Sequence, residues 1–193
     1  MPYFPENVKT ESVSRYISPS KLPAGKTKFR FLGDPMFFFE TWIKNPDGSS
    51  TPKRFAMDED IPLSEVGPDG VKQVMATKVY NYTQKAIQIM SITQVTILSP
   101  LKLASENKKY GEPTGYDTYI SKTGVGQQSR YTFDKDPKEK LSDEVIKADK
   151  MVEMDLHLLL IGADPFLKDS TPQTVDKTTV VKTNDKDESE IPF

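Results

Sequence analysis

Alternating polar and apolar residues run through the first half of the chain and predict β-strands there. At residues 28–31 a basic residue precedes a phenylalanine twice, so one side of the strand can be buried while the other meets water. The glycine and proline at 33–35 predict a break or a bulge, and the aromatic run at 36–43 continues the strand. The Asn-Pro-Asp-Gly sequence at 45–48 is typical of a tight turn, and it predicts a return strand around 53–55.

Further strands follow the stretch 57–70, which is acidic and rich in proline and glycine and which we interpret as a loop. Residues 71–82 and 86–92 alternate in the same way and predict two adjacent strands. Residues 116–122 and 128–133 predict a hairpin, because a Thr-Gly-Val-Gly turn separates them.

Two helices are predicted in addition. An apolar stripe from Val95 to Leu103, interrupted by Pro100, favours a short helix. A second helix is predicted over 142–160, with a serine at its start and Gly162 as its stop. The apolar face of this second helix would pack on the strands, which is the usual role of such a face, or on another subunit.

The order of these elements fits a five-stranded barrel with a helix between its strands, which is the OB architecture. The predicted fold is therefore mainly β, and a β-sandwich is the alternative, although the strands are few for one. The predicted organisation is an extended N-terminal arm at 1–25, an OB-fold domain at 26–140, a C-terminal helix at 141–167 and a disordered acidic tail at 168–193.

Composition narrows the classes of function. The chain has 26 basic and 28 acidic residues, and residues 168–193 hold four of the former and six of the latter. The rest of the chain is therefore neutral, and a neutral body binds phosphate only if its basic groups gather on one face. Without cysteine, and with His157 as the single histidine, no structural zinc and no cofactor are expected. No stretch approaches membrane-spanning length, so we expect an intracellular protein without a membrane partner.

The C-terminus combines carboxylates with an apolar tip that cannot form a core of its own. Such a tip fits a pocket on a partner, with the terminal carboxylate held by donors and the acids drawn to a basic rim. A solubilising acidic tail is the alternative. The tip resembles the acidic Ile-Pro-Phe end of bacterial single-stranded DNA-binding proteins, which implies that it docks partner proteins. The predicted partner-binding residues are Asp187, Glu188, Glu190, Ile191, Pro192 and Phe193.

A second resemblance lies in the middle of the chain. Four stretches are similar to the bacteriophage family of single-stranded DNA-binding proteins with an OB fold: Lys-Val-Tyr-Asn-Tyr at 78–82, the run at 87–94, Gly-Glu-Pro-Thr-Gly-Tyr-Asp at 111–117 and Lys-Thr-Gly at 122–124. The similarity covers roughly residues 26–140 and is most specific at 111–117. It implies non-catalytic coating of single-stranded DNA in phage replication, recombination or repair, in the cytoplasm of the infected bacterial host. Replication or recombination proteins are the implied partners, and assembly into a homo-oligomer is left open.

The residue types that single-strand binding needs are present in the predicted strands. Aromatic faces stack on bases, at about 1–3 kcal/mol per base whatever the sequence, and cations follow the phosphates. Tyr80 and Tyr82 share a strand face with Lys78 and are expected to be exposed, whereas Trp42 can equally belong to the core. The predicted DNA-binding residues are Lys28, Arg30, Trp42, Lys53, Arg54, Lys78, Tyr80, Tyr82, Tyr116, Lys122 and Arg130.

Three other classes of function stay open at this point. An enzyme such as a nuclease would rely on the acidic cluster at 58–60, but no nucleophile or base motif accompanies it, so no enzymatic activity is expected. A protein-interaction or structural phage module would use the tip and the second helix without DNA. RNA or duplex DNA binding is also compatible with an OB fold.

Overall fold

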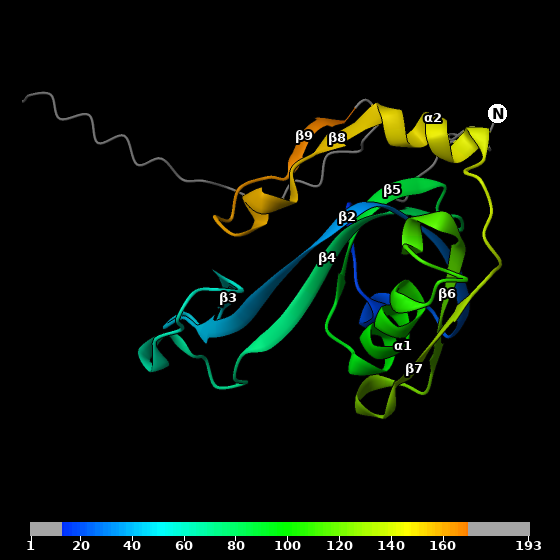
Figure 1. The fold of residues 1–193 in the computed structure, drawn as a ribbon. Coiled ribbons are helices and arrows are strands. Elements are labelled where there is room, and N and C mark those ends of the chain that lie inside the picture. Colours follow the sequence, from blue (N-terminus) through cyan, green and yellow to red (C-terminus); the bar gives the residue numbers. More distant parts are fainter. Residues whose placement is uncertain (1–12, 170–193) are drawn as a thin grey trace, which may run out of the picture. The chain divides into compact units, whose positions relative to one another are not determined.

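The computed structural model describes residues 13–169, which form a mainly β structure with two α-helices (Figure 1). A mixed sheet of seven strands is accompanied by a small two-stranded sheet. The helices are α1 (Val95–Glu106) and α2 (Asp143–Met151), and the short 3-10 turns are η1 (Pro19–Lys21), η2 (Leu63–Glu65), η3 (Pro113–Gly115), η4 (Gly126–Gln128) and η5 (Leu156–Leu159). The strands are β1 (Tyr16–Ile17), β2 (Gly25–Lys44), β3 (Ser50–Ala56), β4 (Lys72–Asn81), β5 (Ala86–Ile92), β6 (Asp117–Thr123), β7 (Arg130–Lys135), β8 (Val152–Met154) and β9 (Phe166–Asp169).

Strand β2 organises the large sheet, because it spans 20 residues and pairs with three other strands. Its first part pairs antiparallel with β6, its second part with β3, and β4 runs along both parts. The β2–β4 register shifts between Leu32 and Met36, and Gly33 has a φ of 73°, a conformation that glycine adopts without strain. The bulge predicted at 33–35 is therefore confirmed, as are the strands on either side of it.

The remaining strands extend the sheet in the order β1-β5-β4-β2-β6-β7, with β3 attached to β2. The predicted strands at 71–82 and 86–92 and the hairpin at 116–133 are confirmed. Within residues 13–169, β1 and β7 do not pair with each other, so this sheet is not closed into a barrel. Residues 13–25 of the predicted arm lie on the sheet, since β1 pairs in parallel with β5 and Leu22 is 3% exposed.

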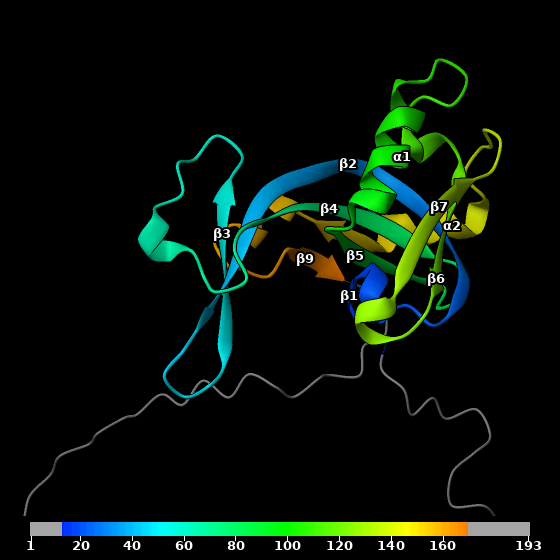
Figure 2. The same ribbon diagram turned by 90° about the horizontal axis from the view of Figure 1, so that it is seen from below.

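Helix α1 covers one side of the sheet (Figures 1 and 2). It continues through Pro100, so the predicted interruption is wrong. Its buried face is made of Ile97, Leu101 and Ala104, because spacings of four and three residues return to the same side of a helix. The predicted stripe included Val95 and Leu103, which are 70% and 68% exposed.

The segment from α2 to β9 covers the opposite side of β2, β4 and β5 (Figure 1). The helix predicted over 142–160 ends at Met151, and that prediction is wrong beyond this point. The chain becomes extended at Val152, which is 3% exposed, and the Asp155 side chain accepts a hydrogen bond from His157 N that starts the separate turn η5. Lys168, assigned to the tail, lies in β9.

Both faces of the central strands are therefore buried. One group of buried residues forms the core on the α1 side, and a separate group forms the core on the α2–β9 side. Consecutive residues of β4 from Val74 to Thr77 are all buried, as expected for a strand between two layers. The core on the α1 side consists of Leu22, Phe29, Phe31, Met75, Val79, Met90, Ile92, Ile97, Leu101 and Ile120. The core on the α2–β9 side consists of Leu32, Phe38, Val74, Ala76, Tyr80, Ile87, Ile89, Val145, Val152 and Leu159.

Candidate nucleic-acid interface

Arg30 is buried and serves to hold the fold together. Its side chain is 3% exposed and donates to the carbonyl oxygens of Thr114 at 3.1 Å and Glu139 at 2.6 Å. It also donates to Asp117 Oδ1 at 3.2 Å. These bonds tie η3 and the segment after β7 to β2, so the prediction of an accessible phosphate contact at Arg30 is wrong.

Lys28 lies in a group of lysines, tyrosines and carboxylates on the outer side of β2, β6 and β7. Its Nζ is 2.7 Å from Asp117 Oδ2 and 4.8 Å from the ring centre of Tyr82. The hydrogen bond with Asp117 raises the pKa of Lys28 to about 12. Tyr82 donates its hydroxyl to Asp117 Oδ1 at 2.9 Å, and burial together with this bond raises the pKa of Tyr82 to about 12.

A second lysine completes this group. Lys26 Nζ lies 4.0 Å from the ring centre of Tyr119 and 3.2 Å from Asp134 Oδ2, and Tyr119 donates to Asp136 at 2.7 Å. The Lys135 backbone N–H and Lys26 lower the pKa of Asp134. We call this group the paired patch; it consists of Lys26, Lys28, Tyr82, Tyr119, Asp117, Asp134 and Asp136. It brings predicted residues together, but its carboxylates neutralise its cations.

Lys78 and Tyr80 hold the α2–β9 segment on the sheet. Lys78 Nζ donates to the carbonyl oxygens of Asp149 at 3.2 Å and Val152 at 2.6 Å and lies 2.7 Å from Asp149 Oδ1. Tyr80 is 1% exposed and donates to Glu144 at 2.8 Å, and burial raises its pKa. The expected exposure of Tyr80 is wrong, because the segment that covers it comes from a distant part of the sequence.

Tyr116 and Lys122 also have structural contacts. Tyr116 is fully buried, and burial raises its pKa, so its predicted role as a stacking surface is wrong in this structure. Lys122 donates to the carbonyl oxygens of Ser20 at 2.6 Å and Leu22 at 3.0 Å. It thereby holds the η1 region against β6.

The hairpin of β2 and β3 carries the next predicted residues. Lys53 is 2.6 Å from Glu65, and Arg54 Nε is 2.9 Å from Glu40 while its guanidinium donates to Leu159 O at 2.9 Å. Trp42 is 42% exposed, and its Nε1 donates to Glu40 at 3.1 Å. Arg130, at the start of β7, is exposed and forms no ion pair with any residue of the range 13–169.

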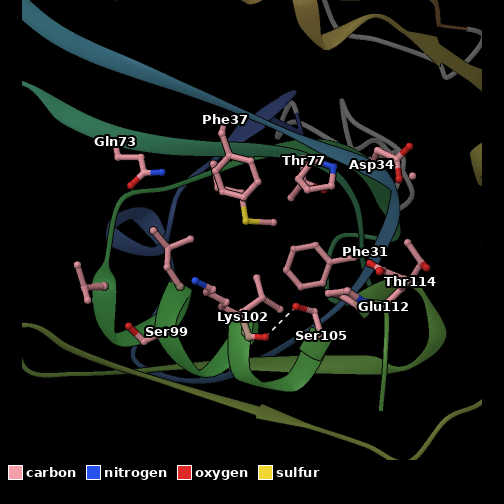
Figure 3. A pocket seen from close by; sticks show the side chains of 17 residues that line it. Phe31, Asp34, Phe37, Gln73, Thr77, Ser99, Lys102, Ser105, Glu112 and Thr114 are labelled. Atoms are coloured by element: carbon pink, nitrogen blue, oxygen red, sulfur yellow. Dashed lines mark hydrogen bonds between the residues drawn. The ribbon is translucent and has the colours of Figure 1, made fainter. Parts of the chain in front are cut away.

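A cleft between α1 and the β2–β4 pair was not predicted. Its volume is about 480 Å³, and Figure 3 shows Phe37 from β2 and Gln73 from β4 pointing toward the Lys102 side of α1. Phe37 is 41% exposed, whereas the next residue, Phe38, is 1% exposed on the other face. The apolar walls are completed by Phe31, Met75, Val95 and Leu98.

The stretch 111–117 closes one end of this cleft. Glu112, Pro113 and Thr114 line it, while Asp117 is 4% exposed and accepts from Arg30, Tyr82 and Lys28. The stretch therefore links the cleft to the paired patch through buried contacts.

The predicted partner-binding residues 187–193 lie outside the described residues. In residues 13–169, no helix is both long and apolar enough to cross a membrane, and no group of three or more histidine, aspartate or glutamate side chains is placed to hold a metal ion. Comparison of the chain with protein-family models, with curated proteins and with solved structures finds no match.

Proposed function

We propose that this protein binds single-stranded DNA without catalysis and that bases enter the cleft between α1 and the β2–β4 pair. The observation that carries the proposal is the half-exposed Phe37 in an apolar cleft of about 480 Å³, a volume typical of ligand sites. Every base has a flat face that stacks on an aromatic ring, so Phe37 can receive any base. Gln73, Ser99 and Lys102 at the same cleft supply polar groups beside it.

The order of the strands supports an OB architecture as part of this proposal. Counted from β2 and leaving out β3, the order β5-β4-β2-β6-β7 is third, second, first, fourth and fifth, and α1 lies between the third and fourth strands. An OB fold is a partly open five-stranded Greek-key barrel that often binds oligonucleotides across its second and third strands. Here one face of those strands is covered by the α2–β9 segment and the other by α1, so we place the strand in the cleft beside α1, where Phe37 is half-exposed.

Substitution of Phe37 tests the cleft directly. The anisotropy of a labelled oligo-dT, titrated with the full chain at low and moderate salt, is expected to show binding that duplex DNA and RNA do not compete away. Phe37→Ala is expected to weaken this binding by about 5- to 150-fold, the loss of about 1–3 kcal/mol of stacking. No binding by the unaltered chain would contradict the function.

Trp42→Ala is the matched control, because Trp42 is an aromatic residue of the same strand with nearly the same exposure and lies outside the cleft lining. It is expected to leave affinity within about threefold, the scatter of a surface substitution. An equal or larger loss with Trp42→Ala would move the binding surface to the β2–β3 hairpin and contradict the cleft.

We also propose that the acidic tip docks replication or recombination proteins of a phage-infected host. Its resemblance to the tip of bacterial single-stranded DNA-binding proteins supports this role. Deletion of residues 185–193 is expected to leave oligo-dT affinity unchanged or tighter, because an acidic segment competes with phosphate for basic groups. Loss of oligo-dT binding on this deletion at matched salt would show that the tip belongs to the DNA site.

A further inference from the structure

A group of lysines surrounds Tyr110 beyond the end of α1. Lys135 Nζ lies 4.2 Å and Lys109 Nζ 5.5 Å from the centre of the Tyr110 ring. Lys138 lies beside them, because a Cβ placed on Gly111 would be 3.3 Å from its Nζ. We call Lys109, Tyr110, Lys135 and Lys138 the Tyr110 cluster.

No lysine of the Tyr110 cluster forms an ion pair with a residue of the described range. For Lys135 the reason is the alternation of β7. Lys135 is flanked by Asp134 and Asp136, but these carboxylates lie on the opposite face and contact Lys26 and Lys28. Glu112, the nearby acid of the cleft lining, makes no ion pair with the cluster either. The charge of the cluster is therefore left for a ligand.

The Tyr110 cluster is continuous with the cleft. Tyr110 and Gly111 donate their backbone N–H groups to Asn107 O at the end of α1, and the Tyr110 ring packs edge-on against Tyr116 at 6.0 Å between ring centres. The residues that follow, Glu112 to Thr114, line the cleft. The cluster therefore adjoins the end of the cleft that Glu112 to Thr114 line.

We infer that the Tyr110 cluster is a phosphate subsite that holds the sugar–phosphate backbone of a nucleic acid strand where it leaves the cleft. This inference rests on the function proposed above and assigns a separate task to each part. The cleft takes bases through stacking, and the cluster takes phosphates through charge. Tyr110 is half-buried. Its ring positions the ammonium groups of Lys109 and Lys135, and its exposed edge is offered to the strand.

The salt dependence of binding tests this assignment. Each phosphate neutralised on a single strand contributes about 0.7 to the slope of log affinity against log salt. A variant with Lys109→Gln, Lys135→Gln and Lys138→Gln is therefore expected to lower the magnitude of that slope by about 2 for oligo-dT. A control variant with Lys147→Gln, Lys150→Gln and Lys168→Gln removes the same charge from exposed positions of α2 and β9 and is expected to keep the slope.

The outcomes separate this inference from the proposed function. If the unaltered chain binds and Phe37→Ala weakens binding, but both triple variants keep the slope, the phosphate subsite is contradicted while the cleft stands. If both triple variants lower the slope equally, the effect is one of total charge, and the subsite is again contradicted. If the unaltered chain does not bind oligo-dT, the function and the subsite fall together. Thermal unfolding of each variant establishes that the compared proteins are folded.

Discussion

The paired patch and the Tyr110 cluster both combine lysines with tyrosines, but only the paired patch contains carboxylates that neutralise its lysines. Each places two lysine ammonium groups near tyrosine rings. In the paired patch Asp117, Asp134 and Asp136 contact the lysines, whereas the Tyr110 cluster has no such contacts among the described residues. The comparison teaches that interleaved lysines and aromatics do not by themselves mark a nucleic-acid site. What distinguishes the two groups is the side of the strand on which the carboxylates lie.

The comparison extends to the other predicted cations. Arg30, Lys78 and Lys122 each donate to backbone carbonyl oxygens of distant segments. A carbonyl group buried without a donor is costly, so these side chains stabilise the junctions between segments. These three side chains therefore have a structural role in this fold.

The largest expected effect comes from removing a cation that the fold uses. Arg30→Met leaves buried Asp117 without one of its partners and two carbonyl oxygens without donors, and breaking such a buried pair costs about 3–5 kcal/mol. We expect the free energy of unfolding in urea to fall by that amount.

Arg130→Met is the matched control for Arg30→Met, because Arg130 is exposed and has no ion pair with a described residue. Its effect on unfolding is expected to stay within about 0.5 kcal/mol. A similar loss of unfolding free energy for the two variants would contradict the distinction between cations that stabilise the fold and cations that remain available to a ligand.

A smaller effect is expected from the titration of the paired patch. The pKa of Tyr82 is raised to about 12 from its usual 10.0, and that of Lys28 to about 12 from 10.5. Well below pH 10 both groups are protonated whether the chain is folded or not. As the pH rises from 10 toward 12, the unfolded chain loses these protons first, so stability falls with pH.

Tyr82→Phe removes one of the groups of the paired patch whose pKa is raised. We therefore expect the urea midpoint of this variant to depend less steeply on pH between 10 and 11 than that of the unaltered chain. An unchanged slope would mean that the Tyr82 hydroxyl does not contribute to the pH dependence of the paired patch.

Much of the sheet was predictable because its signals are local. The bulge at 33–35 and the turn at 45–48 depend on glycine and proline within a few residues, and the strands around them alternate regularly. The end of α2 at Met151 was not predictable in this way. Residues 152–159 keep an apolar pattern, but they form the strand β8 and the turn η5 in place of a continued helix. They pack onto β4 and β5, and that surface is absent from any local window of sequence.

The types of residue in the candidate nucleic-acid interface were predictable from the sequence, but their positions in the structure were not. Strand alternation placed Tyr80 and Tyr82 on one face correctly, but it assumed that this face meets water, and the α2–β9 segment covers Tyr80. Phe37 was the opposite case. It lies in a run of three phenylalanines just after a bulge, and the pattern alone does not show that α1 leaves this ring exposed while Phe38 is buried on the other face.

The length of β2 has a consequence for how the chain acquires its structure during synthesis. The second part of β2 finds its partners β3 and β4 soon after it is made, whereas its first part also needs β6, which ends at Thr123. Contacts between residues far apart in sequence form slowly. A ribosome-bound chain that has not yet exposed Thr123 therefore carries an edge at Gly25–Arg30 that offers free backbone groups to any other extended chain, until β6 pairs with that edge.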